Sequence, residues 1–486
     1  MRAHSTMYAV LLAAFLTLSC GASLHGSSAA LAKGPPASGG DLAWVEDAAE
    51  GCLRGKVAVV TGATQGIGLE VARLLAGRAR ADLVMACRNM TACSTVAAQI
   101  RQDFPGAAVQ CAHLDLASLA SVSHFADALP RMHKSGVAPH LLVQNAGVMG
   151  VKNRQTEDGF ETTFQVNHLA PLLLALRLFP ALASDPSSPS SHYDPASPTA
   201  ASADATRGAA GKGAAGENGD EGAGARRVGW GEQPRVVWVS SGLHRWGTVT
   251  DEANEVEVEG GVCGLDAVAY RQNRGWGKSI GSFQAYATSK LFNSLTAAEA
   301  AARFAKASTA CAAQKPERRL SADAAPLLLP TAVSVRPGTV ATGIARDLPW
   351  WRGVMGVLGA AGMLRSPEEA ARGVVFAALA PPPLVQPGGY YDHGAPASLH
   401  PAVLDRSVSS RVWDESEAML RTWRLLTGAR PWWQEAKRER RAPRGDVPTA
   451  RALAADMVMD GYDRVAAARM WEEARFSIKP GTGEAE

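Results

Sequence analysis

From residue 55 onward, short apolar runs alternate with segments in which apolar residues recur at helical spacing. The runs are rich in β-branched residues and are predicted to be strands: 56–62, 81–87, 107–116, 139–147, 234–242 and 331–338. Residues 66–78, GIGLEVARLLAGR, have the spacing of a helix. Continuous apolar runs are typical of parallel strands buried on both faces. The alternation predicts an α/β fold, a doubly wound parallel sheet flanked by helices.

Three segments interrupt this alternation. Residues 184–233 are rich in Ser, Pro, Ala, Gly and Asp, and their apolar surface is too small to offset the entropy of ordering. This segment is predicted to be a disordered insertion. A second insertion is expected at 308–330, and residues 426–486 are expected to form a C-terminal extension. The sequence thus indicates one domain over residues 45–425, with insertions.

The first 40 residues have a composition of their own. Residues 7–20 are apolar, Arg2 precedes them, and no acidic residue occurs before Asp41. A cleaved secretory signal, a short membrane anchor and an organelle transit peptide all fit this pattern. The corresponding localisations are the secretory pathway or the endoplasmic reticulum membrane, with an organelle such as the plastid as the alternative. Membrane association through this segment is an expectation, and residues 1–40 are left out of the fold.

Charge and cysteine usage exclude two classes of function. The 486 residues are 47% hydrophobic and 20% charged, with a formal net charge of +3. A nucleic-acid-binding domain would show a stronger basic field, so we expect no nucleic-acid partner. The seven cysteines form no CxxC pair and no His–Cys spacing typical of zinc ligands. We therefore expect no metal site and mostly free, buried thiols.

A glycine-rich turn follows the first predicted strand. The sequence TGATQGIG, 61–68, contains Gly62, Gly66 and Gly68, with Thr64, Gln65 and Ile67 between them. Glycines allow a tight turn and a close approach of backbone to a pyrophosphate, which binds at a helix N-terminus. Because the turn connects a strand to a helix, it predicts a nucleotide site. The alternative is a tight turn without a ligand.

The second predicted strand ends in MACRN, which contains Arg88. A fold that binds NAD carries an acidic residue near this place for the ribose hydroxyls, whereas an arginine can pair with the 2′-phosphate of NADP. The sequence therefore favours NADP(H) over NAD(H). The alternative for Arg88 is a solvated loop charge.

Residues 55–423 resemble the short-chain dehydrogenase/reductase family, which has a Rossmann-type fold. The motifs that carry the resemblance occur in the family's order: TGATQGIG, DL at 115–116, NAG at 145–147, VNHLA at 166–170, VSS at 239–241, YATSK at 286–290 and RPG at 336–338. More narrowly, VMACRN, VSSGLH and YATSKLFN are similar to the branch of retinol dehydrogenases, WW-domain-containing oxidoreductases and protochlorophyllide reductases.

The resemblance implies a catalytic tetrad. Tyr286 would exchange a proton with the substrate oxygen, and Lys290, one helical turn away, would favour the ionised phenol and hold the nicotinamide ribose. Ser241 would hydrogen-bond the substrate oxygen, with Ser240 as the alternative. Asn167 would orient a water between Lys290 and solvent.

The same resemblance assigns further cofactor-binding residues. Asp115 and Leu116 would border the adenine. The remaining assignments are Asn145, Ala146 and Gly147 on the adenine-ribose side, and Pro337, Gly338, Thr339 and Thr342 near the nicotinamide and pyrophosphate. The NAG motif is equally compatible with a structural role. For His168 and His244 we favour structural roles.

The leading hypothesis is an NADP(H)-dependent oxidoreductase that interconverts a carbonyl and an alcohol on an apolar, retinoid-, steroid- or lipid-like molecule. Residues 344–364, with LPWWRGVMGVLGAAGML at 348–364, are interpreted as a lid over that substrate or as a packed amphipathic helix. Two alternatives stay open: an NADP(H)-binding regulatory or assembly protein with little catalysis, and a C=C reductase of the protochlorophyllide type. An oligomer is compatible with the family.

Overall fold

The computed structural model describes residues 42–132, 139–151, 155–179, 229–249, 277–314, 330–340, 343–345, 351–382 and 384–427. The predicted leader at 1–40, most of 184–233, Thr342 and the chain beyond residue 427 lie outside these ranges. The chain divides into two compact units, residues 1–251 with 264–417, and residues 252–263 with 418–486. The sheet belongs to the first unit, to which the description below is confined.

One eight-stranded sheet forms the centre of the first unit, with the strand order β3-β2-β1-β4-β5-β6-β7-β8. Its strands are β1 (Val57–Thr61), β2 (Asp82–Cys87), β3 (Val109–His113), β4 (Leu141–Gln144), β5 (Arg235–Val239), β6 (Thr331–Arg336), β7 (Tyr390–Asp392) and β8 (Ala395–Pro396). All neighbours pair in parallel except β7 and β8. The six predicted strands and the doubly wound Rossmann-type fold are confirmed; β7 and β8 were not predicted.

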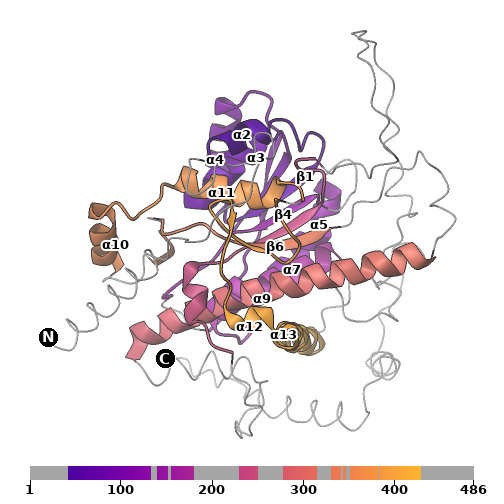
Figure 1. The fold of residues 1–486 in the computed structure, drawn as a ribbon, viewed down its shortest axis with the longest axis vertical. Helices are drawn as coiled ribbons and strands as arrows, with labels where there is room; N and C mark the ends of the chain where they lie inside the picture. The colour runs from indigo at the N-terminus through magenta and orange to yellow at the C-terminus, as the bar shows by residue number, and fades with distance from the viewer. Residues whose placement is uncertain are drawn as a thin grey trace, which may run out of the picture. The chain divides into compact units, whose positions relative to one another are not determined.

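Helices cover both faces of this sheet (Figure 1). One layer contains α2 (Trp44–Ala48), α3 (Gly66–Gly77), α4 (Met90–Asp103) and α11 (Pro367–Leu379). The other contains α5 (Leu119–Met132), α7 (Ala170–Leu178) and the long α9 (Gly277–Gln314). Further elements are α6 (Thr162–Phe164), the π-helix η1 (Gln165–Leu169), the 3-10 helices η3 (Gly242–Trp246) and η5 (Gly343–Ala345), α10 (Trp351–Ala360), α12 (Pro401–Leu404) and α13 (Arg406–Thr427).

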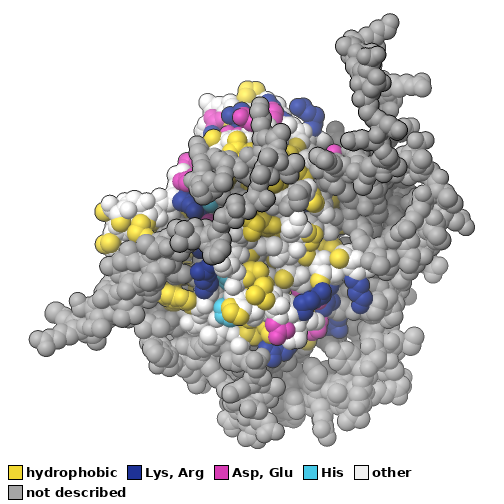
Figure 2. Space-filling model, viewed as in Figure 1, with side chains coloured by type: hydrophobic (Ala, Val, Ile, Leu, Met, Phe, Trp, Pro, Cys, Tyr) yellow, Lys and Arg dark blue, Asp and Glu magenta, His cyan; other side chains and the backbone are white. Residues whose placement is uncertain are grey.

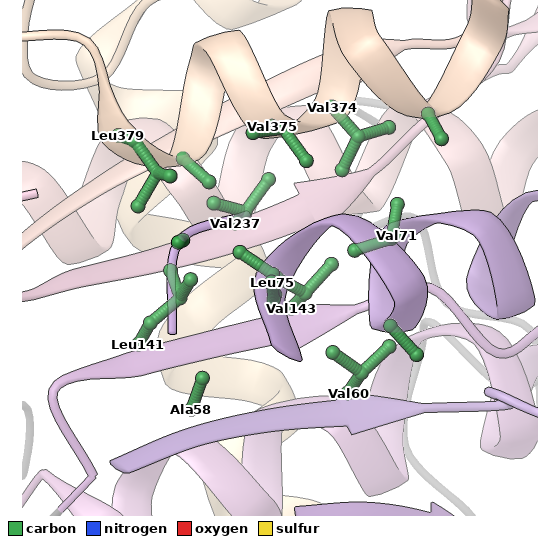
Figure 3. Packing of buried hydrophobic residues seen from close by; sticks show 14 of the residues in the cluster. Ala58, Val60, Val71, Leu75, Leu141, Val143, Val237, Val374, Val375 and Leu379 are labelled. Carbon is green, nitrogen blue, oxygen red and sulfur yellow. The ribbon is translucent and has the colours of Figure 1, made fainter. Parts of the chain in front are cut away.

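The core between α3, α11 and the sheet is apolar throughout (Figure 3). Val71 and Leu75 of α3 and Val374 of α11 are fully buried against strand residues such as Val143 and Val237. Each such side chain stabilises the fold by about 1.5–3 kcal/mol. This packing fixes the axis of α3, and with it the position of the glycine turn at its N-terminus.

The end of the predicted disordered insertion is part of the folded unit. Trp230 packs edge-on against Trp44 and Phe376, with ring centroids 5.8 and 6.2 Å away. The carbonyl of Gly231 accepts a hydrogen bond from Lys56 Nζ at 2.7 Å and lies 2.8 Å from His140 Nε2. The insertion predicted for 184–233 therefore ends before residue 229. The low average hydropathy of this segment gave no indication that Trp230, near its end, packs against the folded unit.

One pair of cysteines also departs from the prediction. Cys93 of α4 and Cys111 of β3 form a disulfide, although the sequence predicted mostly free thiols. Their separation of 18 residues gave no sign that a helix would lie against the neighbouring strand at these positions. Cys52 and Cys87 are free, and burial raises the pKa of each thiol to about 11. Such thiols are unreactive at neutral pH.

Within the described ranges, no helix combines the length and the apolarity that a membrane span requires.

Candidate active site

The predicted site residues lie at the carboxyl ends of the parallel strands, where ligands bind in open α/β sheets. Strand β1 ends at Thr61, and Gly62 and Gly66 then adopt φ values of +66° and +56°. A Cβ atom on Gly68 would lie 2.3 Å from the carbonyl oxygen of Gly62 and 2.4 Å from Nδ2 of Asn145. Gly68 therefore allows α3 to begin directly against the turn.

The N-terminus of α3 carries no side-chain cap. Its N-cap residue, Gln65, makes no capping hydrogen bond, whereas Asn89 caps α4 and Ser366 caps α11 in the same layer. Thr64 and Ile67 are half-buried in the turn, and Gln65 is exposed. The first N–H groups of a helix need acceptors, so this end of α3 fits a phosphate group.

The NAG motif ties β4 to the end of β1. Oγ1 of Thr61 accepts hydrogen bonds from the backbone N–H groups of Asn145 and Ala146, at 3.1 and 3.0 Å. The side chain of Asn145 donates to the carbonyls of Thr61 and Gly62. These bonds support the structural interpretation of the motif. They hold the glycine turn and the segment that leads to Gly147 together as one rigid cluster.

Arg88 follows β2 and its side chain is exposed. In the part of the chain that the structure describes, no carboxylate pairs with it. Asp115 follows β3, and its carboxylate accepts a hydrogen bond from the N–H of Ala117 at 2.9 Å. Leu116 is buried, and its carbonyl accepts from the side chain of Gln165. Arg88 and Asp115 thus lie at the carboxyl ends of their strands, as the glycine turn does.

Tyr286 is 6% exposed, on the face of α9 that meets η3. Burial raises the pKa of Tyr286 to about 12, an effect that the neighbouring side chain of Ser241 partly opposes. Ser241 is the N-cap of η3, and its Oγ accepts from the N–H of Leu243 at 3.2 Å. The predicted serine and tyrosine are therefore brought together, although 45 residues separate them in the sequence.

Lys290 lies one turn further along α9. Its Nζ donates to the carbonyl of Val239 at 2.9 Å and lies 5.6 Å from the ring centroid of Tyr286. Burial lowers the pKa of Lys290 to about 8. At pH 7 the ammonium still predominates, so a positive charge lies beside the phenol.

Asn167 lies in the π-turn η1 and is buried. Its Oδ1 accepts from the N–H of Val148 at 2.8 Å, and its Nδ2 donates to the Val148 carbonyl and to Oγ of Ser289. A Cβ atom on Gly147 would lie 3.2 Å from Oδ1 of Asn167 and 3.3 Å from Nζ of Lys290. The asparagine and the lysine therefore face each other across Gly147.

The neighbouring serine has a different task. Oγ of Ser240 donates to the backbone carbonyl of Lys290 at 2.7 Å and accepts from Oγ of Ser294 at 3.1 Å. Ser240 thus fastens β5 to α9. Because the hydroxyl of Ser240 is engaged by α9 in this way, Ser241 rather than Ser240 is the serine beside the phenol of Tyr286.

The loop after β6 is held by a cluster that the sequence did not reveal. Gly338 has a φ of +90°, and a Cβ atom there would lie 2.6 Å from the Arg365 guanidinium. Arg365 contacts the Pro337 carbonyl, and its N–H donates to the Thr339 carbonyl at 2.9 Å. Asp392 of β7 pairs with Arg365. Residues 337–339 thus have a fixed path; Thr342 lies outside the described residues.

The two histidines are both buried. Nε2 of His168 lies 2.8 Å from Oγ of Ser416, and burial lowers the pKa of His168 to about 3. Nδ1 of His244 lies 2.8 Å from the carbonyl of Ser241, next to the hydroxyl of Tyr390. The buried contact with Ser416 fits the structural role expected for His168. The contact of His244 with the serine was not predicted, and neither was any role for Tyr390.

An apolar cluster covers Tyr286. Leu358 of α10 is 1% exposed and packs with Tyr286, Met149 and Phe283. Trp246, Ile344, Val354, Met355, Met363 and Leu364 lie around them. Part of the segment interpreted as a lid or as a packed helix therefore lies over the phenol. Among the described residues, no group of three or more His, Cys, Asp or Glu side chains could hold a metal ion.

Residues 56–188 match the family model of short chain dehydrogenases. Retinol dehydrogenase 13 of Homo sapiens is 42% identical over 136 residues, which are 28% of this chain and 40% of that protein. Short chain dehydrogenase rstn4 of Aspergillus nomiae is 42% identical over 142 residues, 29% of this chain and 38% of that protein. The chain thus spans two fifths or less of these relatives' length.

A solved structure of an NADPH-bound carbonyl reductase from chicken fatty liver is 16% identical, covering 71% of this chain and 99% of that one, with a TM-score of 0.38. The family model and these relatives agree with the family resemblance that the motifs indicated. Over these residues the chain is therefore similar to short chain dehydrogenases, and among the relatives it resembles is retinol dehydrogenase 13.

Proposed function

We propose that this protein is an NADP(H)-dependent oxidoreductase that interconverts a carbonyl and an alcohol on an apolar substrate. One observation carries the proposal: the buried phenol of Tyr286 has the side chain of Ser241 beside it and the ammonium of Lys290 one turn away, and it lies beneath an apolar cluster. A proton donor, an oxygen-binding hydroxyl and a fixed positive charge are what carbonyl reduction requires.

The chain offers a fitting place for the cofactor. The uncapped N-terminus of α3 would hold the pyrophosphate, and the exposed Arg88 would pair with the 2′-phosphate of NADP(H). Asp115 and Leu116 would border the adenine, with residues 145–147 beside its ribose. Pro337, Gly338 and Thr339 would pass the nicotinamide. When bound, the nicotinamide would supply or accept the hydride.

The side chains on α9 and η3 would handle the oxygen and its proton. Because burial raises the pKa of Tyr286 to about 12, the phenol is protonated at neutral pH and ready to donate to a carbonyl oxygen. Ser241 would donate a hydrogen bond to the same oxygen. The charge of Lys290 would stabilise the phenolate left behind. Asn167, facing Lys290 across Gly147, would hold the water that returns the proton.

The cluster over Tyr286 supports an apolar substrate. Phe283 and Trp246 pack with ring centroids 5.6 Å apart, and Leu358 and Met355 of α10 complete an apolar lining. Figure 2 shows further hydrophobic side chains on α10, where Val357 is 52% exposed. A helix with apolar residues on both its faces suits a lid that an apolar molecule could displace. A retinoid-, steroid- or lipid-like carbonyl compound matches this lining.

The test mixes the purified full chain with NADPH and a panel of apolar aldehydes and ketones, and follows the loss of NADPH absorbance. We expect turnover of at least one apolar carbonyl compound and none in Tyr286→Phe, which should still bind NADPH with nearly unchanged affinity. NADPH binding without turnover of any compound would instead favour a regulatory or assembly protein. Products that have lost a C=C bond would favour a reductase of the protochlorophyllide type.

A further inference from the structure

Two buried aromatic side chains converge on the backbone carbonyl of Ser241. Nδ1 of His244 lies 2.8 Å from this oxygen, and the hydroxyl of Tyr390 donates to it at 3.3 Å. The two rings also contact each other, with centroids 4.7 Å apart, and the Tyr390 hydroxyl lies 3.2 Å from Nδ1. His244 is fully buried and Tyr390 is 3% exposed. The carbonyl also accepts the backbone N–H of His244 at 3.0 Å, so two side chains and one amide hold it.

The protonation state of His244 follows from these contacts. The pKa of His244 is lowered to about 4, mainly by burial and to a smaller extent by Arg245, His400 and Arg336, while the hydrogen bond to the Ser241 carbonyl opposes this shift. The ring is therefore neutral at pH 7. Since Nδ1 lies against a carbonyl oxygen, it carries the proton and donates. Nε2 is then left as a buried acceptor, and among the described residues it has no partner.

Tyr390 presents its hydroxyl from a rigid support. It lies on β7, in register with Ser334 of β6. Asp392, two residues further along β7, forms ion pairs with Arg336 and Arg365. Arg365 also contacts the Pro337 carbonyl at the start of the loop at 337–339. A strand of three residues is thereby locked at its end, so the hydroxyl of Tyr390 has a fixed position.

We propose that His244 and Tyr390 are positioning residues for the reaction, which act through Ser241. By holding its carbonyl, they keep Ser241 extended at the start of η3, with φ −154° and ψ 154°, so that its hydroxyl points at Tyr286. This inference rests on the proposed function. It adds two residues, 146 positions apart in the sequence, to the catalytic machinery without contact to the substrate.

The decisive variant is Tyr390→Phe, because it removes one hydroxyl and leaves the ring. Its matched control is Tyr391→Phe on the same strand. The hydroxyl of Tyr391 accepts from the N–H of Gln386, and its ring packs on the opposite face of the sheet, in the core with α11. Tyr390→Phe should lower kcat about tenfold, the effect of one lost hydrogen bond expressed in the transition state. NADPH affinity should not change. Tyr391→Phe should keep the wild-type kcat.

Three further readouts separate positioning from a general loss of stability. First, the side chain of Ser241 lowers the pKa of Tyr286, so the pH profile of alcohol oxidation should move to higher pH in Tyr390→Phe. Second, Tyr390→Phe should have little effect in a Ser241→Ala background, because both changes remove the same interaction. Third, His244→Asn, which keeps a donor near Nδ1, should retain more activity than His244→Phe.

Equal kinetics for Tyr390→Phe and Tyr391→Phe, or effects of Tyr390→Phe and Ser241→Ala that add, would overturn the inference. If the wild type reduces no carbonyl compound, the proposed function fails first. The inference is then tested by hydrogen–deuterium exchange at the amides of Leu243 and His244, which bond the side chain and the carbonyl of Ser241. Tyr390→Phe should speed this exchange and Tyr391→Phe should not; unchanged exchange would refute the positioning role.

Discussion

Nζ of Lys290 lies 5.6 Å from the ring centroid of Tyr286, and both side chains are buried on one face of α9. Burial moves their pKa values toward the neutral form of each group, to about 8 for the lysine and about 12 for the tyrosine. Burial therefore separates two pKa values that are close together in water, so the phenol keeps its proton at a pH where the lysine already loses its charge. This relationship gives the clearest pH prediction.

Carbonyl reduction should weaken as pH rises through about 8. Below that pH Lys290 keeps its charge and Tyr286 keeps its proton; above it the lysine becomes neutral first. We expect kcat for reduction to fall with an apparent pKa near 8 in the wild type. Lys290→Met should be slow at every pH and should lack this step. The control is Lys56→Met, because Lys56 lies at the amino end of β1, away from the reacting groups. A flat pH profile in this variant as well would contradict the assignment of the step to Lys290.

Arg88→Asp should weaken NADPH binding far more than NADH binding. The substitution replaces a partner of the 2′-phosphate by a repelling charge, whereas the ribose hydroxyls of NADH can bond to the new carboxylate. Losses of about 10- to 100-fold for NADPH are expected for a lost charge-assisted hydrogen bond. The measurement is fluorescence titration with both cofactors. Arg80→Asp, at the other end of β2, should change neither affinity.

Gly68→Ala should disrupt the turn at the start of α3. Its Cβ atom would meet the Gly62 carbonyl at 2.3 Å, a backbone atom that cannot move aside without shifting the turn. Overpacking of this kind costs about 1–3 kcal/mol, which urea unfolding should register together with a loss of NADPH affinity. Gly353→Ala in α10 meets nothing within 4 Å. That variant should keep the wild-type stability, and equal losses in both would argue against the clash.

The folded state should lose stability in mild acid. Burial lowers the pKa of His168 to about 3 and that of His140 to about 4, from 6.5. Below pH 6.5 the unfolded chain binds protons that the folded chain does not, so stability falls as the pH drops toward 4. The slope is at most about 1.4 kcal/mol per pH unit for each histidine. Urea unfolding of His168→Gln should show a shallower slope, and an unchanged slope would exclude His168 as a contributor.

Reduction of the Cys93–Cys111 disulfide should destabilise the protein. A bridge that closes a loop of this length contributes about 3 kcal/mol, mainly by restricting the unfolded chain. Thermal unfolding with and without dithiothreitol should show a lower midpoint in reductant. The Cys93→Ser/Cys111→Ser double variant should be insensitive to reductant. A Cys87→Ser variant, which removes a thiol that is free in the wild type, should remain as sensitive to reductant as the wild type.

The sequence predicted those parts of the fold that leave a local pattern. Six strands were visible because most of them are continuous apolar runs, and α3 because of its helical spacing. Strand β7, with three residues, is too short for any period to be recognised. The arrangement of Tyr286 and Lys290 on one helix face follows from their spacing. The contacts of Tyr390 with His244, and of Cys93 with Cys111, join distant positions, and no local pattern encodes them.

The anchoring of Trp230 and Gly231 has a practical consequence. Both segments that flank residues 180–228 attach at the amino ends of the strands: α7 runs back from the site to Leu178, and Gly231 is fastened beside Lys56 and His140. The reacting groups lie at the carboxyl ends of the strands. A reporter or affinity domain spliced between these two attachment points would therefore be joined to the fold at positions away from the reacting groups.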